Sequence, residues 1–278
     1  MSALGGIAQG GITPIAVWFS MGVAIEAIAL AIDDLNGLAH VLSIVCLIVA
    51  VMIANFYRDP DRPIPKDEGI IVSPADGHVM FVVRERATGR RPSTDETSVS
   101  DPLTGDWHET PCEEPLQFLN EQRWEGVPNG EESDTDAWRV AIFMSPLDVH
   151  VNRAPIAGTI IRMEHRTGKG FRRGPFVPAY RKESVWNERI RTVFEDDDGL
   201  HIESTQISGR LARTIVPWSG EGDTLRRGQR YGMIRLGSRV DVRVPATLFE
   251  PTVIGVNANN PEFPKGEFVQ AGTSILFK

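Results

Sequence analysis

Two long apolar segments open the chain. Residues 15–32 carry only a serine and Glu26 as polar side chains, and residues 38–56 carry only a histidine, a serine and an asparagine. Each segment has about the length of a bilayer-spanning helix, which needs roughly 20 residues. The link between them is short and acidic, so the pattern predicts a transmembrane helical hairpin within residues 1–57. Glu26 favours the alternative of two buried helices in a soluble core, because a carboxylate at membrane depth is costly.

The charges around these segments predict how the hairpin is oriented. No basic residue precedes the first segment, and a second apolar segment follows at once, so a cleavable signal peptide fits poorly. Arg58, Arg62 and Lys66 follow the second segment. Basic residues beside membrane spans concentrate on the cytoplasmic side. We therefore expect a protein of the cell membrane whose main body, residues 58–278, lies in the cytoplasm.

The body has the pattern of β structure. Pro60, Pro63 and Pro65 end the second apolar segment and form a stiff linker. Short runs rich in Val, Ile and Phe then recur between Gly, Pro, Asp and Asn residues, which is typical of strands and turns. The expected strands are Ile70–Val72, Val79–Val83, Trp138–Phe143, Thr159–Glu164, Ile190–Phe194, Leu200–Ile207, Leu211–Val216, Tyr231–Leu236, Val240–Val244, Pro251–Gly255 and Thr273–Phe277. We predict a mainly β fold, a compact β-barrel or barrel-sandwich-like body behind the hairpin.

Residues 88–137 interrupt this pattern. They hold 13 acidic side chains and three arginines in a chain whose net charge is −8, so the rest of the chain is mildly basic. Low hydrophobicity and high charge predict a solvated insertion without a catalytic role. Within it, residues 117–124 are a candidate short helix.

Composition excludes several classes of protein. A net charge of −8 is the wrong sign for a nucleic-acid-binding protein. Two cysteines, Cys46 and Cys112, cannot form a disulfide framework, and no metal-binding pattern is present. With 41% hydrophobic residues, the 278-residue chain is long enough for a real core.

Three places concentrate reactive side chains. The first is the turn Ser73–His78, where Asp76 precedes a glycine, a position usually occupied by a turn residue. The second is Ser145–Arg153, where a strand ends near His150. The third is Gly237-Ser238 between two apolar runs, which alone would read as a bulge or tight turn. Each signal is weak by itself.

Together, in this order behind a membrane hairpin, these segments resemble the phosphatidylserine decarboxylase proenzyme family in its shorter bacterial and archaeal branch. The resemblance extends over most of the chain. It includes Phe56-Tyr57-Arg58-Asp59-Pro60, the Ser73–Gly77 turn, Ser145–Pro155, Asn187-Glu188-Arg189, and Gly228-Gln229 leading into Gly232–Val242. The acidic insertion is longer than expected for this branch.

The resemblance implies a self-processing enzyme. Members of the family cut their backbone before a serine and convert that serine into a covalent pyruvoyl group, which replaces an external cofactor. Here the cut falls between Gly237 and Ser238, giving a β chain, 1–237, and an α chain, 238–278, that remain associated. Glycine without a Cβ permits the strained backbone that the acyl shift needs. His150 oriented by Asp76 is the expected base for the Ser238 hydroxyl, as in other Ser-His-Asp arrangements.

The resemblance also implies a phospholipid substrate, phosphatidylserine or archaetidylserine, which becomes the corresponding ethanolamine lipid plus CO₂. Longer relatives carry a second histidine where this chain has Arg153, so His150 or His78 is left to transfer the proton during turnover. Basic residues near a Gly-rich segment are candidates for contact with the lipid phosphate and the anionic membrane face; they include Arg162, His165, Arg166 and Lys169. The sequence leaves the oligomeric state open, a homo-oligomer included.

Two other functions are compatible with parts of the sequence. The segments Gly222–Gln229 and Lys265–Gly272 match turns of barrel-sandwich modules, so a membrane-anchored adaptor without catalysis is the alternative. The coincidence of Asp76, His150 and Gly237-Ser238 weighs against it. A pyruvoyl enzyme acting on a soluble amino acid conflicts with the hairpin.

Overall fold

The computed structural model describes most of the chain in two compact units. The described residues are 6–32, 37–85, 98–100, 107–109, 137–166, 187–209, 214–235, 238–256 and 265–278. The first unit, here called the hairpin unit, comprises the chain up to Asp61 together with Pro146–Val151. The second, the body, comprises Arg62–Ser145 and Asn152–Lys278.

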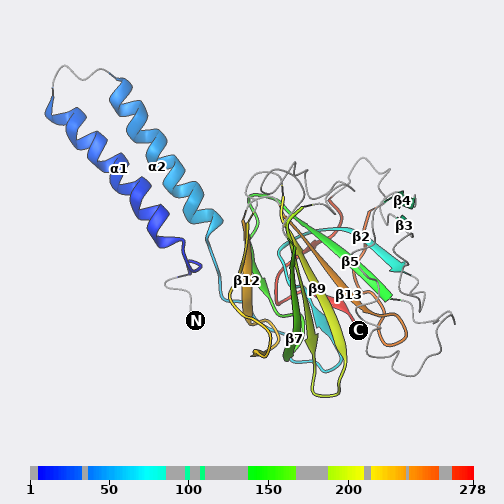
Figure 1. Ribbon diagram of the computed structural model, residues 1–278. Helices are drawn as coiled ribbons and strands as arrows, with labels where there is room; N and C mark the ends of the chain where they lie inside the picture. The colour runs from blue at the N-terminus through cyan, green and yellow to red at the C-terminus, as the bar shows by residue number, and fades with distance from the viewer. Residues whose placement is uncertain are drawn as a thin grey trace. The chain divides into compact units, whose positions relative to one another are not determined.

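Two helices, α1 (Ile12–Ala31) and α2 (Leu38–Phe56), lie side by side in the hairpin unit (Figure 1). Small residues line their contact, and the buried ones are Gly22, Ala29, Ala39, Ser43, Cys46 and Ala50. A Cβ at Gly22 would lie 3.0 Å from the Leu47 side chain, so the small residue permits close approach. The first helix begins three residues earlier than predicted, because Pro14 is tolerated within a first helical turn.

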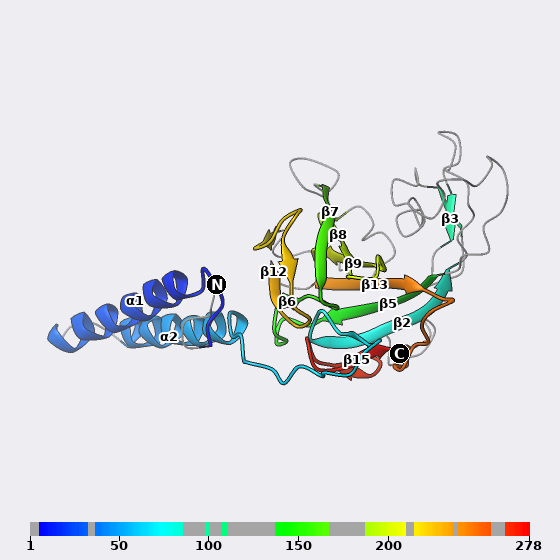
Figure 2. The ribbon, with the colours of Figure 1, turned by 90° about the horizontal axis from the view of Figure 1, so that it is seen from below.

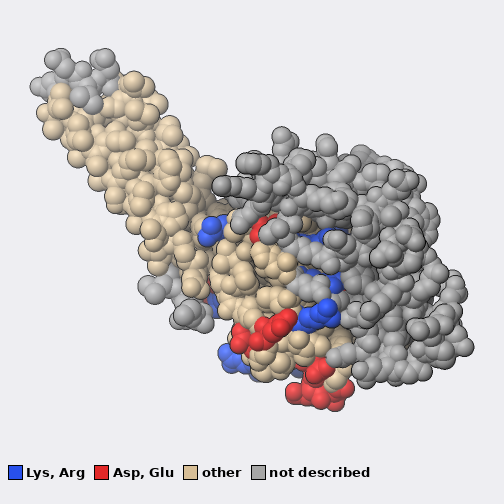
Figure 3. Space-filling view, in the orientation of Figure 1, with Lys and Arg blue, Asp and Glu red and all other residues tan. Residues whose placement is uncertain are grey.

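The outer surface of the two helices is apolar. Figure 3 shows no acidic side chain and no lysine or arginine on the visible face of α1 and α2. Both helices are long and apolar enough to cross a membrane, and only 11% and 22% of their apolar windows are buried. This low burial speaks against two core helices of a soluble protein. Glu26 is accommodated by pairing, because its Oε1 lies 3.0 Å from Nδ1 of His40 on the other helix.

The body is built on an antiparallel eight-stranded sheet with the order β11-β7-β8-β9-β13-β5-β2-β14 (Figure 2). In that order the strands are Thr224–Leu225, Gly158–Arg166, Arg189–Glu195, His201–Ile207, Ser238–Pro245, Ala137–Met144, Gly77–Glu85 and Phe268–Val269. The central strand β13 pairs with β5 along its whole length and with β9 from Arg239 to Arg243. It alternates between Val240, Val242 and Val244, buried in the main apolar core, and charged residues on its other face.

Three small sheets complete the described strands. One has the order β10 (Thr214–Pro217), β12 (Arg230–Arg235) and β6 (Val151–Arg153). A second joins β1 (Ile71–Val72) to β15 (Ile275–Phe277). The third, β3 (Ser98–Ser100) with β4 (Trp107–Glu109), falls within the acidic insertion.

The structure confirms the mainly β class and corrects several predicted elements. The apolar run Pro251–Gly255 is not a strand, since only Pro251 makes a bridge, to Phe277. The sequence missed β6, β11 and β14, because strands of two or three residues carry too little alternation to be recognised. The candidate helix at 117–124 and residues 211–213 of a predicted strand lie outside the described residues.

Candidate active site

Ser238 occupies the first position of β13. It is completely buried, and its cross-strand partner on β5 is Met144. The Ser238 hydroxyl donates to the Met144 thioether, with an Oγ–Sδ distance of 3.3 Å. A thioether is a weak acceptor. The hydroxyl is thus held in place without being committed to a strong hydrogen bond.

The chain changes sheets just before this serine. Strand β12 ends at Arg235 in the three-stranded sheet, whereas β13 begins at Ser238 in the eight-stranded sheet. Leu236 and Gly237 lie outside the described residues. A cut before Ser238 would therefore fall at the junction of two strands and leave the pairing of β13 with β5 and β9 intact.

A buried ionic cluster lies three residues beyond the serine. Asp241 accepts from Arg239 through Nε at 2.6 Å and Nη2 at 2.7 Å, and from Nε of Arg139 at 2.8 Å. Burial alone would raise the pKa of Asp241, but the neighbouring guanidinium groups outweigh it and hold that pKa well below its usual range. Both arginines also lie over the ring of Phe81, each 5.6 Å from its centroid. The cluster ties β13 to β5 on the face opposite to that of Ser238, because side chains alternate along a strand.

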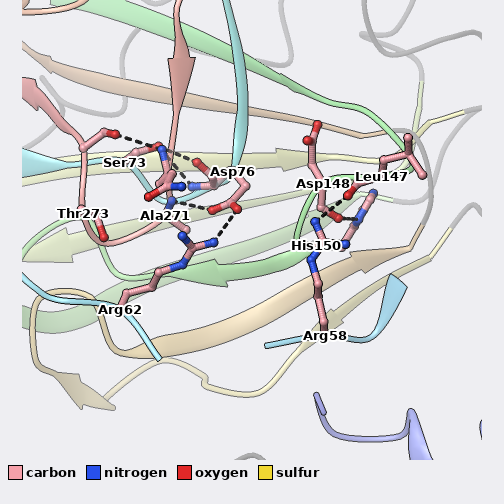
Figure 4. Close-up of polar contacts among 12 residues, drawn as sticks. Arg58, Arg62, Ser73, Asp76, Leu147, Asp148, His150, Ala271 and Thr273 are labelled. Atoms are coloured by element: carbon pink, nitrogen blue, oxygen red, sulfur yellow. Dashed lines mark hydrogen bonds and ion pairs between the residues drawn. The ribbon is translucent and has the colours of Figure 1, made fainter. Parts of the chain in front are cut away.

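Asp76 lies in the tight turn before β2. Ser73 donates through its hydroxyl to the carbonyl of Ala75 at 2.7 Å. Gly77 has a φ of 152°, and a Cβ there would lie 2.2 Å from the carbonyl oxygen of Phe143, so only glycine fits. The carboxylate of Asp76 accepts from Nη2 of Arg62 at 2.6 Å and from the backbone N–H of Ala271 at 2.8 Å (Figure 4).

His150 belongs to the hairpin unit and is completely buried. Its Nδ1 lies 2.8 Å from the carbonyl oxygen of Asp148 (Figure 4). A carbonyl can only accept, so Nδ1 carries the proton and Nε2 keeps its lone pair. Within the described part of the chain, Nε2 has no hydrogen-bond partner. The ring packs against Phe56, the last residue of α2, with centroids 4.4 Å apart.

Burial keeps this imidazole neutral. The pKa of His150 is lowered to about 4. Desolvation is the largest cause and the cation of Arg58 acts in the same direction, against the opposing effects of the Asp148 carbonyl and carboxylate. At neutral pH the side chain is thus an unprotonated base with an unoccupied lone pair. These are the properties that general-base catalysis needs.

The sequence analysis predicts that Asp76 orients His150. In the structure the contact of Nδ1 of His150 is with the carbonyl of Asp148. Asp76 and Ser238 belong to the body and His150 to the hairpin unit. Their joint role in self-cleavage stays a prediction.

The two secondary candidates make structural contacts. Nδ1 of His78 lies 2.8 Å from the carbonyl oxygen of Gly266, and its ring packs edge-on against Phe268. Arg153 is buried on β6 and donates through Nη1 to the carbonyl of Gly228 at 3.0 Å. A catalytic role of either residue stays a prediction.

The predicted lipid contacts are only partly described. Arg162 is exposed on β7, and His165 on the same strand lies 2.9 Å from the carboxylate of Glu188. Arg166 ends β7, but its side chain is not described, and Lys169 lies outside the described residues. In the described ranges, no group of three or more His, Cys, Asp or Glu side chains is arranged to hold a metal ion.

Sequence reasoning missed the partners of the predicted residues. Arg62 was interpreted only as a membrane-flanking charge, and Met144, Asp148 and Ala271 were not singled out. Asp148 precedes His150 by two residues, a spacing that a local backbone contact could have suggested. Asp76 is separated in sequence by 14 residues from Arg62 and by 195 residues from Ala271. No local sequence pattern predicts contacts between residues so far apart.

Taken together, the geometry defines a β protein with a membrane-type hairpin, a weakly held buried serine at a strand junction and a neutral buried histidine. The family model for phosphatidylserine decarboxylase matches residues 49–277. The chain belongs to the phosphatidylserine decarboxylase family.

Individual relatives cover most of the chain. It is 34% identical over 236 residues to the phosphatidylserine decarboxylase proenzyme of Nitratidesulfovibrio vulgaris, covering 85% of this chain and 82% of the relative. It is 37% identical over 229 residues to the protein of the same name from Erythrobacter litoralis, covering 82% and 73%. A Methanopyrus kandleri protein provisionally named an archaetidylserine decarboxylase proenzyme is 34% identical over 240 residues, covering 85% and 86%.

Proposed function

We propose that the chain is a proenzyme that cuts itself between Gly237 and Ser238 and then acts as a carboxy-lyase. Its substrate is phosphatidylserine or archaetidylserine, and its products are the corresponding ethanolamine phospholipid and CO₂. The names of the relatives supply the substrate class. The position of Ser238 carries the argument for this chain. A buried, weakly held hydroxyl lies at the first residue of the central strand, where a cut before it leaves the pairing of that strand intact.

Self-cleavage balances with the groups present and one water. Oγ of Ser238 bonds to the carbonyl carbon of Gly237, the peptide C–N bond breaks, and the hydroxyl proton passes through a base to the freed amine. Loss of the Cα proton then expels the carboxylate of Gly237 from Cβ. Water converts the resulting enamine into a ketone and ammonia. The neutral His150, with a lone pair on Nε2, has the properties of the base that these proton transfers require.

The site fits a pyruvoyl group. Met144, whose thioether contacts the Ser238 hydroxyl, would help to hold the group, and conversion of the serine would break no strong hydrogen bond there. When present, the pyruvoyl carbonyl supplies the electron sink for decarboxylation. The chain's own contribution is to bury this group and to return a proton afterwards, which we assign to His150.

The hairpin unit supports a lipid substrate. Phe56 ends the apolar helix α2 and packs on His150. Arg58 donates to the carbonyl of Asn55 at 2.9 Å and to the carbonyl of Leu147 at 2.6 Å, which fixes the histidine loop to the end of the helix. If α2 spans the bilayer, His150 lies at the depth of the lipid headgroups. The headgroup can then react without the lipid leaving the membrane.

Two details of location and assembly belong to the same proposal. The basic residues Arg58, Arg62 and Lys66 favour a cytoplasmic body at the cell membrane. The exposed Arg162 and the neighbouring basic residues of the sequence favour contact with a lipid phosphate.

The test compares the full chain with two serine variants in phospholipid vesicles. Wild type should release CO₂ from carboxyl-labelled phosphatidylserine and show a 41-residue fragment on denaturing gels, since residue 238 begins a chain that ends at residue 278. Ser238→Ala should lose both, because no hydroxyl remains to attack. Ser204→Ala, which removes another buried serine hydroxyl from the same sheet, should keep both. An active wild-type protein that stays uncut would refute the mechanism, and an inert, uncut one would favour the adaptor.

A second variant separates the two tasks of His150. We expect His150→Ala to leave the chain uncut, because no base takes the hydroxyl proton. Normal cleavage, with a ketone that reacts with hydroxylamine but no CO₂ release, would restrict His150 to turnover. Normal cleavage in His150→Ala together with failure in His78→Ala would show that His78, and not His150, is the base for cleavage.

A further inference from the structure

The segment that leaves the hairpin is seated on the body. Thr273 donates through Oγ1 to the carbonyl of Pro63 at 3.2 Å. A Cβ at Gly228 would lie 2.3 Å, and one at Gly272 2.9 Å, from Cδ1 of Ile64, so two glycine turns make room for this side chain. Arg62, at the start of the segment, is thereby held in a defined place.

Arg62 reaches the carboxylate of Asp76. The Nη2–Oδ2 distance is 2.6 Å, and the exposed fractions of the two side chains are only 13% and 5%. Removing the cation from a buried carboxylate leaves a desolvated charge uncompensated, which destabilises the folded state. Removal of Arg62 would therefore destabilise the ionised carboxylate of Asp76, whereas the pair as observed favours it.

Arg62 and Ala271 donate to different oxygens of Asp76. Arg62 donates to Oδ2, whereas the backbone N–H of Ala271 donates to Oδ1 (Figure 4). One donor alone would allow the carboxylate to rotate about its Cβ–Cγ bond. Two donors on opposite oxygens fix the plane of the group as well as its charge.

We propose that Arg62 is a positioning residue for self-cleavage, which holds Asp76 ionised and in a fixed orientation. This inference rests on the proposed self-cleavage and on the part in it that the sequence analysis predicts for Asp76. It makes the linker behind the membrane hairpin a part of the processing machinery rather than a mere tether.

The experiment follows cleavage of the full chain made by cell-free synthesis in the presence of phospholipid nanodiscs. The variants are Arg62→Gln, Arg62→Lys, Asp76→Asn and the double variant Arg62→Gln/Asp76→Asn. Arg227→Gln is the matched control, since this nearby arginine also contacts the linker, donating to the carbonyl of Asp67 at 2.6 Å, without touching the site. Resistance of the uncut chain to added protease shows whether each variant folds.

We expect Arg62→Gln to cleave at least 10-fold more slowly than wild type, and Arg62→Lys and Arg227→Gln to cleave faster than Arg62→Gln. Added methylguanidine should restore part of the rate to Arg62→Gln, which a purely structural defect would not show. The double variant should be no slower than Asp76→Asn alone, because both changes act through one carboxylate.

The outcomes separate this inference from the proposed function. Cleavage of Asp76→Asn at the wild-type rate would remove Asp76 from processing and with it the basis of the inference. Blocked Asp76→Asn combined with wild-type cleavage of folded Arg62→Gln would overturn the role of Arg62 alone. A slow Arg62→Gln that methylguanidine leaves unchanged, and that slows Asp76→Asn further, would also overturn it.

Discussion

Burial keeps the His150 imidazole unprotonated, and therefore able to accept a proton, at neutral pH. Its pKa is lowered to about 4, mainly because burial disfavours the charged form. The Asp148 carbonyl fixes the protonated nitrogen, so the lone pair lies on Nε2. A solvent-exposed histidine would be partly protonated near pH 6.5 and would lose this capacity.

The lowered pKa has a consequence for stability. The unfolded chain binds a proton at this residue near pH 6.5, whereas the folded chain does so only near pH 4. Between these values the unfolded state binds more protons, so the free energy of unfolding falls as the pH falls, by about 3 kcal/mol from this group.

Thermal unfolding in detergent at pH 7.0 and pH 4.5 measures the effect. The wild-type melting temperature should drop by more than that of His150→Asn, whose side chain does not titrate. Equal drops for the two proteins would contradict the assigned pKa. Ser238→Ala as the common background keeps both chains uncut, so that the same covalent species is compared.

At the level of single residues, the sequence offers candidates but not their contacts. Ser238 and Asp76 are candidates because Gly-Ser between apolar runs and Asp-Gly in a turn are local patterns. The contacts that define their environment, such as Asp76 with Ala271, depend on how distant segments meet in the fold. No local pattern encodes such a meeting.

Strand β13 is the element that joins fold and proposed chemistry. Its alternation of Val240, Val242 and Val244 with charged residues was visible in the sequence and correctly predicted a strand. That the opposite face is buried too, with Asp241 held between two arginines, was not predictable, because such charges normally indicate a solvated face. The failed strand at 251–255 shows the converse, since apolar residues alone do not supply a pairing partner.

The pairing of β13 predicts that the α chain stays bound after cleavage. Both edges of the strand are hydrogen-bonded, and its valines lie in the core shared with β5 and β9. A tag at the C-terminus should therefore recover residues 1–237 in equal amount from cleaved protein in native buffer, through washes with 1 M NaCl.

The fragments should separate only in denaturant. Val242→Asp, which puts an unpaired charge into the core, should weaken their association or prevent folding before cleavage. Release of the α chain by salt alone would show that the sheet pairing does not hold the two chains together.

At the scale of the whole molecule, the hairpin unit and the body divide the proposed tasks. The hairpin unit carries the apolar helices and His150, and the body carries Asp76 and Ser238. The two helices were predictable from length and composition, whereas the assignment of Pro146–Val151 to the same unit was not. That assignment rests on contacts such as Phe56 with His150.

The hairpin predicts firm membrane attachment. Burial of apolar surface is not screened by ions, so the full chain should stay in the membrane fraction through washes with 1 M NaCl and leave it only with detergent. Placing two aspartates on the outer surface of α2, at Val45 and Met52, should shift the chain to the soluble or aggregated fraction. Extraction of the wild type by salt would exclude the transmembrane interpretation.

The position of Ala271 has a consequence for truncated chains. This residue lies seven positions before Lys278, yet its backbone N–H donates to the carboxylate of Asp76. The nearby strand β15 likewise provides the partner of β1. A chain that ends before Ala271 has neither contact, although it still contains Gly237 and Ser238. Integrity of a segment more than 30 residues beyond the cut is thus a condition for the geometry in which the cut would take place.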